Sequence, residues 1–192
     1  MLTHHKLQTR LSGPKYSLML LLCSTLLGTN TASAAPQNLP TNPAIPPAQQ
    51  GVEWNNQGFV LGQQGQYAQA TALYQRALPL LQANDRHTQL NRAATLNNLG
   101  VALSHQQQLN AAAQAFSEAY ILRVHHLGPT AAPALLSQHN LAVTLSGLGQ
   151  TQLACQHMQA ALQGRTATLG AAHRDTQLSA RLLQQIPNCT AL

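Results

Sequence analysis

The residues that most often perform chemistry in proteins are scarce in this chain. Its only acidic residues are Glu53, Asp85, Glu118 and Asp175, and no two of them are spaced as an obvious general acid–base pair. Serine and histidine occur, but the sequence contains neither a nucleophile-elbow motif nor a glycine-rich phosphate-binding loop. We therefore expect a protein that is not an enzyme and that needs no cofactor.

Histidine is the second type of residue that could do chemistry, here by binding metal. Seven histidines follow residue 34: His87, His105, His125, His126, His139, His157 and His173. Adjacent residues on a helix point in different directions, so His125 and His126 would not converge on one ion. No HExxH or His-x3-His pair is present, so we predict no metal site and interpret these histidines as polar surface residues.

The first 34 residues have the layout of a secretory signal peptide. A basic start at Lys6, Arg10 and Lys15 precedes a short apolar run, and Ala32-Ser33-Ala34 is a cleavage site of the A-x-A type. The apolar run over 18–27 is too short to cross a bilayer, which needs about 20 residues. We predict an exported protein, periplasmic or secreted, without a membrane span after cleavage.

Removal of residues 1–34 would take three basic residues from a formal net charge of +6, which leaves +3. This small and dispersed charge argues against nucleic acid as a partner. Residues 35–50 then carry five prolines, at positions 36, 40, 43, 46 and 47. Because proline fixes φ and lacks an amide donor, we predict a disordered linker over 35–50 and folded structure from about Gly51.

The rest of the chain carries an internal repeat with a step of 42 residues. Gly58, Gly100 and Ala142 follow this step, and each further column is also either all small or all large: Leu61/Leu103/Leu145, Ala70/Ala112/Ala154, Tyr74/Phe116/Met158 and Ala77/Ala119/Ala161. A fixed period of this length is typical of stacked helical arrays.

Each unit is predicted to form two antiparallel helices. Its small and apolar residues fall into two groups with the four- and three-residue spacing of a helix face: Trp54, Gly58 and Leu61, then Ala70, Tyr74 and Ala77. The short break at 64–66 forces the two helices to pack side by side. A glycine inside a helix costs about 1 kcal/mol relative to alanine, so its recurrence at 58 and 100 indicates close helix packing.

This pattern resembles the tetratricopeptide repeat, with W-x3-G-x2-L at 54–61 followed by Gly65, Tyr67, Ala70, Tyr74 and Ala77. The 42-residue step is similar to the subtype found in kinesin light chains and many bacterial proteins, in which L-N-N-L-G/A recurs. Here that segment is 96–100, and Asn140-Leu141-Ala142 echoes it. The resemblance covers about 51–186 and implies an all-α fold, an α–α superhelix of three helix pairs at about 51–92, 93–134 and 135–171.

A fourth unit begins but is not completed. Leu169-Gly170 echoes Leu127-Gly128, and Pro187 stops the helix that follows. We predict a capping helix over 172–186 and a tail over 187–192, because a solenoid must cover its last apolar face.

Three departures from the repeat predict local differences in packing. Pro79 should kink or end the second helix of the first unit. Gln138 and Thr151 replace large residues of the other units, so we expect the third unit to pack less tightly.

An asparagine column is the best candidate for a binding site. Asn56, Asn98 and Asn140 again lie 42 apart, and an amide can both donate to and accept from a peptide backbone. The resemblance implies that first helices line a concave face, where such a ladder grips bound peptide. Alternatively, these asparagines hydrogen-bond the adjacent unit or simply descend from a duplicated segment.

Two neighbouring columns are predicted to accompany the ladder: Asn55, Asn97, His139 and Arg181 in one, and Phe59, Val101 and Val143 in the other. Arg181 would suit a carboxylate of the partner, or it is a solvated residue of the cap. The apolar column would contact the partner or complete the core.

Cys155 and Cys189 are the two cysteines that follow residue 34. Counting outward from a turn near Gly170 brings them roughly level on two antiparallel helices, and an oxidising compartment would permit a bridge. We predict a disulfide that pins the cap. Taken together, the sequence favours a non-enzymatic adaptor that binds a protein or peptide, with a structural subunit of a larger assembly as the alternative.

Overall fold

The computed structural model describes residues 45–187 and residue 189, so the predicted signal peptide, most of the linker and most of the tail lie outside the described residues. The described chain is all α-helical and contains no strand. Its elements are α3 (Pro47–Gln63), α4 (Tyr67–Ala77), the 3-10 turn η2 (Leu78–Leu80), α5 (Arg86–His105), α6 (Leu109–Leu127), α7 (Ala132–Gly147), α8 (Thr151–Leu169) and α9 (Arg174–Leu183). The all-α fold expected from the sequence is confirmed.

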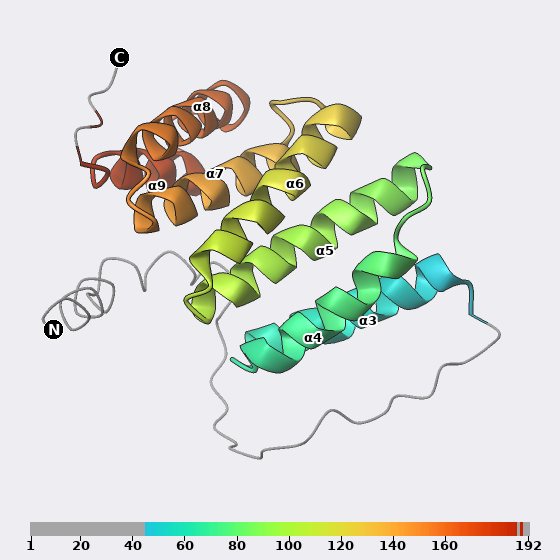
Figure 1. Cartoon of the computed structure of the whole chain (residues 1–192). Coiled ribbons are helices and arrows are strands. Elements are labelled where there is room, and N and C mark those ends of the chain that lie inside the picture. Colours follow the sequence, from blue (N-terminus) through green and yellow to red (C-terminus); the bar gives the residue numbers. More distant parts are fainter. Residues whose placement is uncertain (1–44, 188, 190–192) are drawn as a thin grey trace, which may run out of the picture.

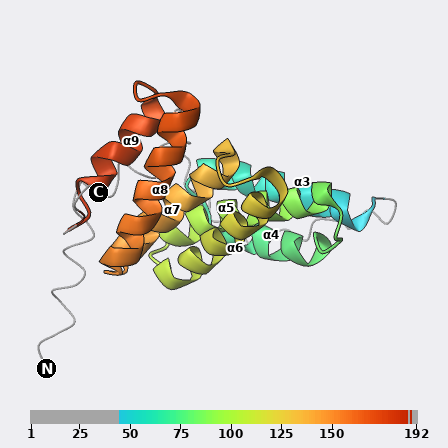
Figure 2. The same cartoon turned by 90° about the horizontal axis from the view of Figure 1, so that it is seen from above.

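The helices form three successive pairs, α3–α4, α5–α6 and α7–α8, and α9 packs on α8 as a single last helix (Figure 1). Each second helix also packs on the first helix of the next pair. In addition, α3 touches α5 and α5 touches α7, whereas no comparable contact joins α4 to α6 or α6 to α8. The first helices therefore lie on the inside of the curved array, which Figure 2 shows from a second direction.

The helices begin and end at other residues than the predicted boundaries. Pro46 has extended backbone (φ −53°, ψ 141°) and Pro47 is the first residue of α3, so the folded part begins four residues before Gly51. Proline suits this position because the first N–H of a helix has no partner within it. The predicted unit boundaries at 92/93 and 134/135 fall inside α5 and α7. The connections lie at 81–85 and 128–131, and the cap helix spans only Arg174–Leu183.

Close packing at the recurring glycines is confirmed. The ring of Tyr74 lies on Gly58 and the ring of Phe116 lies on Gly100, so a methyl group added at either glycine would come within 2.7 Å of a ring carbon. In the third pair the same two positions hold Ala142 and Met158, both buried. The first two pairs therefore combine a glycine with a flat ring, and the third combines an alanine with a flexible thioether.

The turns also follow the repeat. Helix α4 ends at Ala77, two residues before Pro79, and the chain continues as η2, as the proline predicted. The turns between the two helices of a pair each contain one residue with positive φ: Gly65 (76°), Gln107 (61°) and Gly149 (75°). Only glycine adopts this conformation without steric strain, so Gln107 is the strained member of the three.

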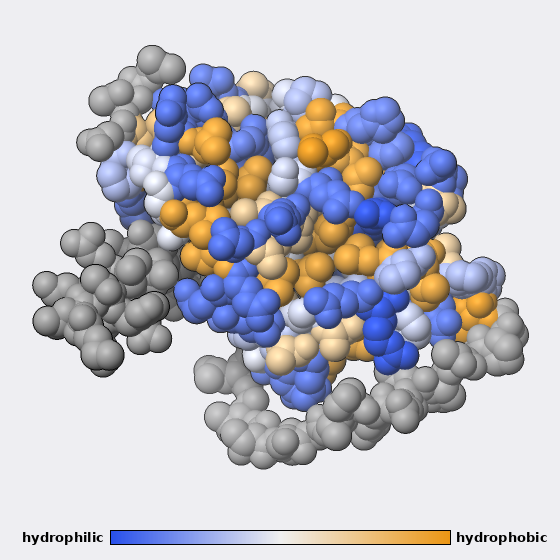
Figure 3. All heavy atoms as spheres, in the orientation of Figure 1, coloured by the Kyte–Doolittle hydropathy of each residue, from blue (hydrophilic) through white to orange (hydrophobic). Residues whose placement is uncertain are grey.

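Large exposed hydrophobic side chains are few in the described part of the chain, and they come from four different helices: Phe59, Val60, Ile121, Leu136, Leu153 and Leu169. On the face shown in Figure 3, hydrophilic residues separate groups of hydrophobic ones. Within the described ranges, every helix is too short or too polar to cross a membrane.

Candidate peptide-binding face and repeat junctions

The first helices expose one narrow face. In α5, every residue from Ala93 to Ser104 is buried except Ala94, Asn98 and Val101, and in α7 every residue over 134–145 is buried except the three at the equivalent positions. Continued along each helix at i, i+4, i+7 and i+11, this face comprises Val52, Asn56, Phe59 and Gln63; Ala94, Asn98, Val101 and His105; and Leu136, Asn140, Val143 and Gly147. We call these twelve residues the inner stripe.

The asparagines of the inner stripe link neighbouring units. The Asn98 amide nitrogen donates to Asn55 Oδ1 at 3.1 Å, and the Asn140 amide nitrogen donates to Asn97 Oδ1 at 3.4 Å. In the first unit, Asn55 donates within its own helix to Asn56 Oδ1 at 3.2 Å. The structural alternative raised by the sequence is therefore real, because two of the three ladder residues hydrogen-bond the preceding unit.

These bonds leave part of each ladder amide free. Asn98 and Asn140 are half-buried, and each uses one N–H for the preceding unit. Within the described residues, neither Oδ1 accepts a hydrogen bond. Each amide therefore still offers an N–H and a carbonyl oxygen, held in a fixed orientation by the bond to the neighbouring unit.

The neighbouring column was placed wrongly in part. Asn97 is 6% exposed and His139 is 2% exposed, because the next helix pair or the cap covers them. These two residues cannot contact a partner. Asn55 remains half-buried and Arg181 exposed, the latter with a hydrogen bond from its guanidinium to Gln177 Oε1 at 3.5 Å.

The apolar column remains accessible to a partner. Phe59 is 39% exposed, and Val101 and Val143 are half-buried. All three belong to the inner stripe, one helical turn from the asparagines.

A buried arginine lies behind the second ladder step. One Arg123 nitrogen (Nη1) donates to Ser137 Oγ at 2.7 Å and to the Pro133 carbonyl at 2.9 Å, and Ser137 Oγ donates to Asn97 Oδ1 at 3.1 Å. Because Asn97 also accepts from Asn140, the relay runs from a buried guanidinium to the ladder. Burial lowers the pKa of Arg123 to about 10, so it remains charged at neutral pH.

The same relay recurs 42 residues later at the cap. One Arg165 nitrogen donates to Ser179 Oγ at 2.7 Å and to the Asp175 carbonyl at 3.0 Å, and it lies 3.2 Å from His139 Nδ1. Ser179 Oγ lies 3.0 Å from the same ring nitrogen. Burial, and then the Arg165 charge, lower the pKa of His139 to about 3, so the imidazole is neutral and Nδ1 is an acceptor.

Sequence reasoning missed this arginine column, although Arg123 and Arg165 are 42 apart. The first junction hides the pattern, because Leu81 occupies the arginine position and is fully buried. There Thr95, at the serine position, donates to the Asn91 carbonyl of its own helix at 2.9 Å. At the arginine position the first junction is therefore apolar, and the next two are polar.

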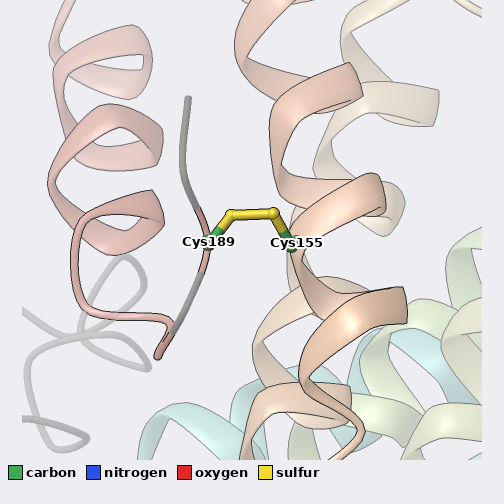
Figure 4. Close-up of a disulfide and its surroundings, with 2 residues drawn as sticks. All are labelled: Cys155 and Cys189. Atoms are coloured by element: carbon green, nitrogen blue, oxygen red, sulfur yellow. A yellow bond between two sulfur atoms is a disulfide. The ribbon is translucent and has the colours of Figure 1, made fainter. Parts of the chain in front are cut away.

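The predicted pairing of Cys155 with Cys189 is present in the structure, with 5.5 Å between the two Cα atoms (Figure 4). It ties the segment after α9 back to α8. At the equivalent place in the first pair, Thr71 Oγ1 accepts a hydrogen bond from Gln106 Nε2 at 2.8 Å. The last junction thus has a covalent link near the position where an earlier one has a hydrogen bond.

The histidines are dispersed rather than clustered, and no group of three potential metal ligands occurs within the described residues. His105 stacks on Tyr67 with 3.9 Å between ring centroids, and burial lowers its pKa. His157 meets Tyr120 edge to face at 6.2 Å. These contacts give the two residues packing roles.

Two models of the tetratricopeptide repeat family match the sequence, one over residues 53–122 and the other over 135–175. Together they cover more than half of the chain and include all three helix pairs. The chain is a tetratricopeptide repeat protein. No individual curated protein matches it significantly. Tetratricopeptide repeats are non-enzymatic protein-interaction modules, so this one acts as an adaptor or scaffold for protein partners.

Proposed function

We propose that this tetratricopeptide repeat protein is an envelope adaptor that holds an extended peptide segment of its partner on the inner stripe. The asparagine row carries the proposal. Asn56, Asn98 and Asn140 lie on successive first helices, are at least partly exposed, and retain free donor and acceptor groups. An extended backbone crossing the helices could bond one amide per unit. The Leu96-Asn97-Asn98-Leu99-Gly100 segment, its echo at Asn140-Leu141-Ala142 and the 42-residue step support assignment to the kinesin-light-chain-like subtype.

Two features support an exported protein. The first 34 residues have the three-part layout of a signal peptide, and a disulfide closes the end of the array. Disulfides persist in oxidising compartments such as the periplasm and are rare in the cytosol. The proposed location is therefore beyond the cytoplasmic membrane.

The rival proposal, a subunit that stacks into a larger array through its open edge, has less support. Gln57 lies on α3 where α5 and α7 have the buried Leu99 and Leu141. Glu53 likewise replaces the fully buried Thr95 and its counterpart in α7. The outer side of α3 therefore carries Gln57 and Glu53 at positions where the later first helices have leucine or a small, fully buried hydroxyl residue.

The proposal is tested by comparing two variants that lose the same hydrogen bond. Asn98→Ala and Asn55→Ala both remove the bond between α5 and α3, but only the first removes a ladder amide. Immobilised parent and variants would be exposed to envelope extract, with circular dichroism confirming that all three are folded.

We expect a partner that the parent retains, that Asn98→Ala loses, and that Asn55→Ala retains in part, because the Asn98 amide is still present but has lost its orienting bond. Equal retention by all three proteins, or equal loss from both variants, would show that the asparagines serve only the array.

A further inference from the structure

The inner stripe has an internal order that narrows the chemistry of its ligand. Its residues form four rows that cross the three first helices: an apolar row of Val52, Ala94 and Leu136; the asparagine row; a second apolar row of Phe59, Val101 and Val143; and an end row of Gln63, His105 and Gly147. The polar row therefore runs between two apolar rows. A ligand that follows it meets hydrogen-bonding groups under its backbone and apolar surface on both sides.

The stripe also lacks charge. None of its twelve residues is Lys, Arg, Asp or Glu, and α7 contains no such residue along its whole length. His105 is the only titratable member, and burial against Tyr67 lowers its pKa, so it is neutral at pH 7. A charged ligand side chain pressed onto this surface would lose water without gaining a counter-charge, which disfavours binding.

The spacing of the units selects a backbone conformation. Helices in direct contact lie about 8–10 Å apart, and the hydrogen bonds from Asn98 to Asn55 and from Asn140 to Asn97 show that the first helices are in such contact. Two residues of a β-strand advance about 7 Å, whereas three residues of a polyproline II helix advance about 9 Å. Only the second repeat matches one unit.

The three-fold symmetry of polyproline II also suits a polar row that has an apolar row on each side. This helix makes no internal hydrogen bonds, so every backbone group is free to bond an asparagine. When two edges of this helix face the stripe, their side chains lie on the two apolar rows and the backbone between them lies over the asparagine row. Its preformed shape also reduces the entropy lost on binding.

We propose that the inner stripe binds an uncharged peptide segment in the polyproline II conformation, with three ligand residues per repeat unit. This rests on the proposed function and specifies its ligand. The recognised segment has proline or small apolar residues and no lysine, arginine, aspartate or glutamate where it crosses the stripe.

The test uses a displayed library of random peptides of about 12 residues, long enough to cross three units. The immobilised protein is panned at about 0.01 M and at about 1 M salt, where the screening length falls from about 30 Å to about 3 Å. Enriched peptides are sequenced, synthesised and measured against the parent, Asn98→Ala, the control Asn55→Ala, and Val143→Asp, which adds a charge to an apolar row.

We expect enriched peptides without charged residues, with proline or apolar residues at a three-residue period, and with affinities that change less than about twofold with salt. Asn98→Ala should weaken them about fivefold to tenfold, the loss expected for one or two hydrogen bonds. Asn55→Ala should weaken them less, because it leaves the Asn98 amide in place and removes only the bond that orients it. Val143→Asp should weaken them more than tenfold.

Two kinds of result would overturn the proposal. Enriched peptides that are acidic or basic and bind only at low salt, or that alternate with a two-residue period, refute the ligand class but leave the peptide-binding function intact. No enrichment at either salt, or peptides that bind Asn98→Ala as well as the parent, refutes the binding function of the stripe as well.

Discussion

A methyl group added at Gly100 would collide with the ring of Phe116. Its carbon would lie 2.7, 2.8 and 2.9 Å from three ring carbons, whereas carbon atoms in contact normally stay about 3.5–4.0 Å apart. The ring is 1% exposed, so it cannot swing into solvent and must push its neighbours. Overpacking of this kind costs about 1–3 kcal/mol.

The helix itself favours the opposite outcome. Alanine is about 1 kcal/mol better than glycine inside a helix, so Gly100→Ala at a site with free space would stabilise the protein. Because three ring atoms are blocked at once, we place the collision near the upper limit and expect a net loss of about 2 kcal/mol in the free energy of unfolding. For a domain of this size, that lowers the melting temperature by about 4–8 °C.

The third pair supplies the compensating change. Ala142 and Met158 occupy the positions of Gly100 and Phe116, so Gly100→Ala with Phe116→Met reproduces a pair that this protein already packs. In urea denaturation, we expect the double variant to be more stable than the sum of the single changes by about 1–2 kcal/mol. A neutral or stabilising Gly100→Ala, or strictly additive single changes, would refute the argument that the ring excludes a side chain at this position.

Four further predictions follow from the junctions and turns. Gln107→Gly should stabilise the protein by about 1 kcal/mol in denaturant titrations, because it relieves the positive φ, and no gain would mean that the turn is unstrained. Reducing the disulfide should remove about 3–4 kcal/mol and raise hydrogen exchange in α9 but not in α3–α6, whereas unchanged exchange in α9 would show that the cap holds without it. Exchange should also be faster in the third pair than in the first, because Gln138 replaces a large apolar residue, and equal protection contradicts this. The pKa of His139 is near 6.5 in the unfolded chain and about 3 in the folded protein, so protonation below pH 6.5 favours the unfolded chain. We expect the free energy of unfolding to fall by about 2 kcal/mol between pH 7 and pH 5. His139→Asn places the residue of position 97 at position 139 and should make the free energy of unfolding depend less on pH in this range. If the parent and the variant show the same pH dependence, His139 is not the group responsible.

The fold was predictable because each unit makes the same helix–helix contacts, and the residues that make them recur at the repeat spacing. Ala70, Ala112 and Ala154 recur at 42-residue steps since each is fully buried in the crossing of its own helix pair. A column of this kind fixes which residues meet but not where a helix begins. From the sequence alone, a proline is equally compatible with a linker and with the first residue of a helix. In the structure Pro46 has extended backbone and Pro47 is the first residue of α3.

The candidate site was predictable only in part. The ladder asparagines lie on the first helices where expected, but the period alone does not reveal which side of a helix the next unit covers. Asn97 and His139 are 42 residues apart, like the ladder residues beside them, and yet both are buried. Their side of each helix faces the junction with the next unit or the cap. The arginine column escaped notice for the opposite reason, since Leu81 interrupts it where the first junction is apolar.

The polar junctions solve a problem that an alanine-rich array creates. Units whose contact surfaces are small and apolar could stack on one another in several registers at similar energy. The relays from Arg123 and Arg165 reach Asn97 and His139 in only one register, and a slip would leave a buried guanidinium without acceptors. Breaking such a buried charge network costs about 3–5 kcal/mol, more than a slipped apolar contact could restore.

The register that these relays select also determines the ladder. Asn97 accepts both from Ser137 behind it and from Asn140 in front of it, so the relay that fixes the stacking also orients the Asn140 amide on the inner stripe. Exchanging Arg123 and Ser137 for the leucine and threonine of the first junction should therefore preserve the fold and loosen Asn140. Binding in which Asn140 takes part would then weaken although no residue of the inner stripe has changed.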